Sequence, residues 1–171
     1  MENLKFDFVF LGQSVLKYQV PLDIFNSINQ IYEQNFNNLI AANSQLVGKI
    51  ENEHSLFYSG QDESKIKRHN MLPRNVTNYF LTVFKHYLAF NKIRDYETHL
   101  NSIWVNEMKQ HEYNPAHIHR GMLFTGLSSV MILKLPSTYG KEYSAEHVQQ
   151  NGRLQILGAA NGQFAKIDYQ P

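Results

Sequence analysis

The sequence contains no cysteine, which excludes disulfides, thiolate metal sites and cysteine nucleophiles. Any bound metal ion would therefore depend on histidine, aspartate, glutamate or glutamine side chains. An excess of either charge is also missing, because 16 basic residues stand against 15 acidic ones. A protein that binds duplex nucleic acid needs a basic surface, so we expect no nucleic-acid partner.

Long hydrophobic runs are absent as well. No apolar segment approaches the roughly 20 residues that cross a membrane, and residues 1–11 are too polar and too short in hydrophobic run for a signal peptide. We therefore expect a cytoplasmic protein without a membrane partner. The ordinary hydrophobic content of 43% over 171 residues predicts a single folded domain, residues 1–171.

The first 99 residues are expected to form a mainly helical support region. Strand composition on both sides of a Gly-Gln turn predicts a hairpin over residues 6–20. Two amphipathic helices should follow, one starting at Pro21 and one capped by Asn75 and ending near Asn91. Their apolar stripes consist of Leu22, Phe25, Ile28, Tyr32, Phe36 and Leu39, and of Val76, Phe80, Val83, Phe84, Tyr87 and Leu88. The segment 43–58 gives no clear pattern, and residues 59–74 are typical of a polar loop.

Residues 100–171 have the composition of a β-region. Strands are expected over residues 103–108, where Trp104 and Asn106 share a face, and over 122–135, the most strand-like run of the chain. Two short strands should flank Asn161-Gly162. Helices segregated from an antiparallel β-region predict an α+β fold.

The motif that carries most chemical information is the pair His117 and His119, just after Asn114-Pro115. If both lie on one strand, their rings share a face and their Cα atoms are about 6.6 Å apart. That spacing allows both to bind one metal ion, and imidazole suits Fe, Zn, Cu and Ni alike. A pair of surface or hydrogen-bonded histidines at a strand start is the alternative.

The motif and its surroundings resemble the 2-oxoglutarate- and Fe(II)-dependent oxygenases of marine phages and bacteria. The resemblance extends over most of the chain. Its matches are Trp104 and Asn106, Asn114-Pro115, His117 and His119, Gly126, Pro136, and the segments 48–53 and 152–156.

This resemblance implies a double-stranded β-helix, or jelly-roll, core behind two supporting helices. It implies Fe(II) and 2-oxoglutarate as cofactor and co-substrate, with His117 and His119 as metal ligands and Asn106 and Tyr113 lining the co-substrate or substrate pocket. The activity would be hydroxylation of a small-molecule or protein substrate, in a bacterial or phage-infected cell.

Two departures from the family pattern bear on this expectation. His119 occupies a position that usually holds Asp or Glu. The chain also ends before the positions of the family's distal histidine and of the Arg or Lys that pairs with 2-oxoglutarate, so the β-core is expected to be incomplete at its C-terminus. An incomplete jelly roll exposes a sheet edge, which favours a homo-oligomer. The alternatives are a non-catalytic jelly-roll remnant that binds a partner, and a different cupin-like metal protein.

Overall fold

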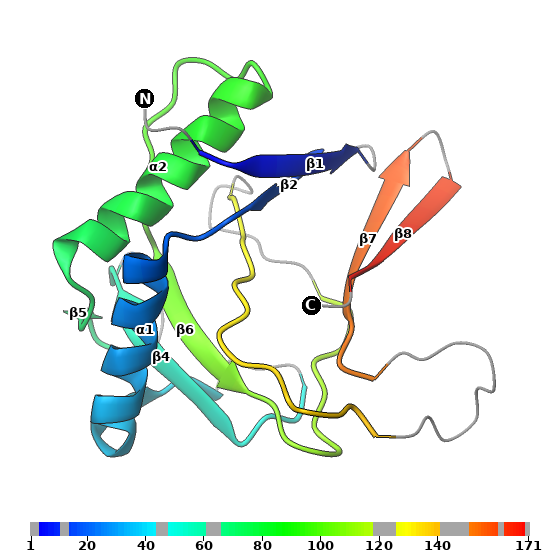
Figure 1. The fold of residues 1–171 in the computed structure, drawn as a ribbon. Coiled ribbons are helices and arrows are strands. Elements are labelled where there is room, and N and C mark those ends of the chain that lie inside the picture. The colour runs from blue at the N-terminus through cyan, green and yellow to red at the C-terminus, as the bar shows by residue number, and fades with distance from the viewer. Residues whose placement is uncertain are drawn as a thin grey trace. The chain divides into compact units, whose positions relative to one another are not determined.

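The computed structural model describes residues 4–10, 14–43, 48–60, 66–117, 126–140, 151–160 and 163–169. It confirms the α+β class, with two helices and antiparallel strands (Figure 1). The chain divides into two compact units, one formed by Met1–Val20 and Val130–Pro171 and the other by Pro21–Ser129. In the described part of the chain, no helix is both long and apolar enough to cross a membrane.

The first helix, α1 (Leu22–Asn35), starts after Pro21 as predicted and continues into the short 3-10 helix η1 (Phe36–Asn38). Its buried residues are Ile24 and Ile28, which are one helical turn apart. The expectation for Leu22 is wrong, because 71% of this residue is exposed. The position lies at the helix start, before the stripe that faces the core.

The second helix, α2 (Arg74–Phe90), ends next to Asn91, close to the predicted position, and contacts α1. Its buried residues are Val76, Tyr79, Val83 and Leu88. Asn75 is not the cap, since the N-cap position belongs to Pro73, with φ −69° and ψ 157°. The extended backbone of that proline sets the entry of the helix, so no side chain is needed to turn the chain there.

A four-stranded antiparallel sheet accompanies the helices in this unit (Figure 1). Its central strand, β4 (Asn52–Tyr58), lies in the segment 43–58, which showed no clear sequence pattern. β4 pairs with β6 (Ser102–Glu107) and with two short strands, one of them within the expected polar loop. The strands are β3 (Ile40–Ala41), β4 (Asn52–Tyr58), β5 (His69–Asn70) and β6 (Ser102–Glu107).

Register divides the β4–β6 pair into two faces. Opposite residues of an antiparallel pair project to the same side. Glu53 faces Asn106 and Ser55 faces Trp104 on one side, whereas His54 and Val105 lie on the other. The register shifts between Ser55 and Phe57, where Leu56 forms a bulge and is completely buried.

The other unit contains two hairpins, each present as predicted. The first pairs β1 (Phe6–Phe10) with β2 (Ser14–Tyr18). The second pairs β7 (Leu154–Ala160) with β8 (Gln163–Tyr169) over seven residue pairs, on either side of Asn161-Gly162, which lie outside the described residues.

The strand predicted over residues 122–135 is wrong for its described part. Residues 126–135 adopt no regular strand, and Val130 is 63% exposed. Strand composition supplies suitable side chains, but a strand also needs a partner for its backbone hydrogen bonds. Residues 122–125 lie outside the described part of the chain.

Candidate functional site

The segment that leads into the histidine motif is tied to the segment before β4 by backbone hydrogen bonds. Lys49 N–H donates to the Tyr113 carbonyl at 2.9 Å, and Tyr113 N–H donates to the Lys49 carbonyl at 3.1 Å. These two bonds form an isolated antiparallel bridge. The chain therefore enters the motif from a fixed point, four residues before His117.

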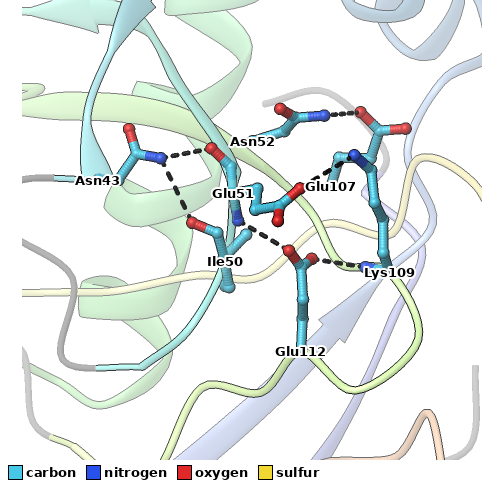
Figure 2. Close-up of polar contacts among 7 residues, drawn as sticks. All are labelled: Asn43, Ile50, Glu51, Asn52, Glu107, Lys109 and Glu112. Atoms are coloured by element: carbon cyan, nitrogen blue, oxygen red, sulfur yellow. Dashed lines mark hydrogen bonds and ion pairs between the residues drawn. The ribbon is translucent and has the colours of Figure 1, made fainter.

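Glu112 strengthens this attachment from the neighbouring position (Figure 2). Its two carboxylate oxygens accept from the backbone N–H of Lys109 at 2.7 Å and of Glu51 at 2.9 Å. These two bonds, first that from Lys109, hold the pKa of Glu112 below its ordinary value. The ion pair of Lys109 with Glu51, at 3.4 Å, is exposed on both sides and contributes little stability.

Two asparagines complete the same polar cluster (Figure 2). Asn52 donates from Nδ2 to the Glu107 carboxylate at 2.9 Å, which joins the first residue of β4 to the last residue of β6. Asn43 donates from its amide to the backbone carbonyls of Ile50 and Glu51. Asn43 thus ties the residues just before β4 to the preceding chain, and Asn52 ties the start of β4 to β6.

Gly48 allows the closest approach at this junction. A Cβ atom at Gly48 would overlap the Tyr113 carbonyl oxygen and would lie 2.8 Å from Asn114 Cα and 2.9 Å from Pro115 Cδ. Two of these three neighbours are backbone atoms, so they cannot move aside cheaply. Glycine is required here by contact with the motif rather than by an unusual backbone conformation.

His117 is exposed, and its ring orientation is defined by its own loop. Nδ1 lies 2.7 Å from the Pro115 carbonyl oxygen. Because a carbonyl can only accept, Nδ1 carries the proton, and in the neutral ring the lone pair is therefore on Nε2. This arrangement is typical of metal-binding histidines, whose second ring nitrogen donates to a carbonyl or carboxylate. His119, the second predicted ligand, lies outside the described residues.

The two residues predicted to line the co-substrate or substrate pocket, Tyr113 and Asn106, both pair with residues of the segment 49–53. Tyr113 is exposed and pairs with Lys49. Asn106 is half-buried on β6 and stands opposite Glu53, with Trp104 on the same face. Among the described residues, no group of three His, Asp or Glu side chains is close enough to hold a metal ion.

Glu53 is the residue of this region that sequence reasoning missed. It is only 6% exposed, its Oε2 atom is buried without a hydrogen-bond partner, and burial raises its pKa. The Oδ1 atom of Asn106, the residue opposite, is also buried without a partner. No local pattern in the sequence marks Glu53, because the face that it occupies depends on the pairing of β4 with β6.

On the opposite face of the sheet, the side chain of His54 lies next to aromatic residues of α1 and η1. The His54 ring packs against Tyr32 and Phe36, with ring centroids 6.0 and 5.0 Å away. Burial lowers the pKa of His54, and the Glu107 carboxylate opposes this shift. Burial and the same carboxylate raise the pKa of Tyr32 to about 12. Both rings therefore remain uncharged near neutral pH and serve here as packing between α1 and the sheet.

Comparison of the chain with protein-family models, with curated proteins and with solved structures finds no match.

Proposed function

We propose that this protein is an Fe(II)- and 2-oxoglutarate-dependent dioxygenase with a jelly-roll core, in which His117 and His119 are metal ligands. The observation that carries the proposal is the hydrogen bond of His117 Nδ1–H to the Pro115 carbonyl, which directs the lone pair to Nε2. The resemblance of the surrounding motif supports the choice of iron, because imidazole alone does not distinguish among Fe, Zn, Cu and Ni.

The residues near the motif fit a metal site in two respects. The His117 ring is held in one tautomer by its own loop, and the loop itself is anchored through Tyr113 and Glu112. Preorganisation of this kind lowers the cost of placing a ligand at an ion. When bound, Fe(II) would supply the activation of O₂, while the protein supplies geometry and a pocket.

The overall reaction would convert 2-oxoglutarate and O₂ into succinate and CO₂, with one oxygen atom inserted into a substrate C–H bond. Under this proposal, His117 and His119 hold the ion and Tyr113 borders the co-substrate. The antiparallel pairing of β4 with β6 and of β7 with β8 is consistent with a jelly roll, which is built from antiparallel strands.

The decisive experiment is calorimetric titration of Mn(II), a redox-inert substitute for Fe(II), with and without 2-oxoglutarate. We expect saturable binding that 2-oxoglutarate strengthens. His117→Ala should abolish binding with little loss of stability, because the exposed ring buries little apolar area. His99→Ala is the matched control, since His99 is also exposed and its contact with Glu97, at 3.4 Å, lies on the surface.

Formation of succinate that requires added Fe(II) and 2-oxoglutarate would extend the result from binding to turnover. Mn(II) binding that is equal in the wild type and in His117→Ala would show that the motif is not the metal site. Binding without 2-oxoglutarate dependence would favour a cupin-like metal protein, and no binding at all would favour a non-catalytic jelly-roll module.

A further inference from the structure

The face of the β4–β6 pair that carries Glu53 holds hydrogen-bond acceptors without donors. Glu53 Oε2 and Asn106 Oδ1 are both buried, and neither has a hydrogen-bond partner. The two residues are opposite each other in register, so their Cβ atoms lie about 4.5–5.5 Å apart and their side chains share a face. The two unsatisfied acceptors are therefore carried by neighbouring side chains.

A buried carboxylate without a partner is unfavourable, because both its charge and its lone pairs have lost their hydration. Proteins satisfy such groups with a cation or with N–H donors. Among the described residues, no side chain donates to Glu53 Oε2 or to Asn106 Oδ1. Ser55, next on this face, donates its hydroxyl to the Phe57 carbonyl instead. A group that is both positively charged and a donor would satisfy the two acceptors together.

Trp104 adds an aromatic surface to the same face. It stands two positions from Asn106 on β6, about 7 Å away along the strand, and is 38% exposed. An indole ring attracts cations and covers the alkyl part of an amphipathic ligand. A carboxylate and an amide oxygen can both accept hydrogen bonds from a protonated amine. An indole beside them can cover the alkyl chain that carries this amine.

We infer that Glu53, Asn106 and Trp104 bind a primary ammonium group, so that the substrate is an alkylamine or a lysine-like side chain. The substrate assignment rests on the proposed dioxygenase function, whereas the binding itself does not. Under this inference Asn106 contacts the substrate and not 2-oxoglutarate, because 2-oxoglutarate is an anion and would be repelled by the carboxylate of Glu53.

The inference can be tested without iron or 2-oxoglutarate by carbon-13 NMR of protein labelled at the glutamate carboxyl carbons. The Glu53 resonance is identified by its absence in Glu53→Gln and, should that variant fold poorly, in Glu53→Asp. The probe is n-butylammonium chloride, titrated at constant ionic strength. Butyltrimethylammonium is the matched control ligand, since it keeps the charge and the alkyl chain but has no N–H donor.

We expect n-butylammonium to shift the Glu53 resonance saturably, with affinity at least tenfold higher than that of butyltrimethylammonium. Asn106→Ala should weaken the binding about tenfold, whereas Glu33→Gln, which removes an exposed acid of α1, should leave it unchanged. Equal responses to both ligands, or no saturable shift, would overturn the inference. So would a Glu53 carboxyl that stays protonated at pH 7 and donates to Asn106, because no ligand would then be needed.

Failure here would leave the proposed function standing, because Mn(II) binding at His117 is measured separately. Conversely, ammonium binding without Mn(II) binding would establish an amine site in a protein that is not a dioxygenase.

Discussion

Substitution of Gly48 by alanine tests whether the histidine motif is held in place by the segment before β4. The added Cβ atom would overlap the Tyr113 carbonyl and lie 2.8 Å from Asn114 Cα. The motif segment must move away, and both hydrogen bonds of the Lys49–Tyr113 bridge lengthen as it does. The effect should therefore reach the position of the histidine motif as well as the stability of the fold.

The magnitude follows from three contributions. Overpacking costs about 1–3 kcal/mol, and weakening two backbone hydrogen bonds costs up to about 0.5–1.5 kcal/mol each. Replacement of glycine by alanine also lowers the entropy of the unfolded chain, which stabilises by about 0.4–1 kcal/mol. The net expectation is a loss of about 1–6 kcal/mol in the free energy of unfolding.

Urea denaturation followed by tryptophan fluorescence is a suitable assay, because Trp104 is the single tryptophan and lies on β6 in the same unit. Gly126→Ala is the matched control. A Cβ atom there would meet no described residue within 4 Å, so the stability of this variant should equal or slightly exceed that of the wild type. If Gly48→Ala were as stable as Gly126→Ala and bound Mn(II) like the wild type, the proposed close contact between Gly48 and the motif would be refuted.

Two further predictions concern stability. The lowered pKa of Glu112 means that its contribution is complete above its ordinary pKa, near 4.5, and is lost as pH falls through the folded-state value. Acid denaturation of Glu112→Gln should therefore lack this component, which Glu33→Gln should retain; identical acid profiles for the wild type and Glu112→Gln would contradict it. Leu56→Ala should cost about 2–5 kcal/mol because the side chain is fully buried, whereas Leu22→Ala, at an exposed site, should change stability by less than about 0.5 kcal/mol. Urea midpoints of the two leucine variants give this comparison, and equal midpoints would refute the assigned core.

Both helices could be predicted from the sequence because their signals are local. Each apolar stripe repeats every three or four residues, and Pro21 and Pro73 precede the helices where the chain must enter them. These are local properties of the backbone, so the sequence carried them without knowledge of the fold. Leu22 and Asn75 were misread because the residue at a helix end depends on the path of the preceding chain.

Whether a strand could be predicted depended on how far away in the sequence its partner strand lies. The hairpins over residues 6–20 and 154–169 were predictable because each pairs with its own neighbour across a short turn. β4 was not, since it pairs with β6 about fifty residues later and buries polar residues such as Glu53 and Ser55. Residues 126–135 have strand composition without a strand, because composition does not supply a hydrogen-bonding partner.

For the functional site, the sequence by itself determined the chemistry that is available: no thiolate, and two histidines two residues apart. That spacing is a local property, so the hypothesis of a shared metal ion needs no knowledge of the fold. Only the tertiary structure decided that Glu112 and Gly48 anchor the motif, and that Glu53 is buried opposite Asn106 with its acceptor unsatisfied. These features arise from contacts between distant segments, and burial changes the properties of a carboxylate in a way that its position in the sequence cannot reveal.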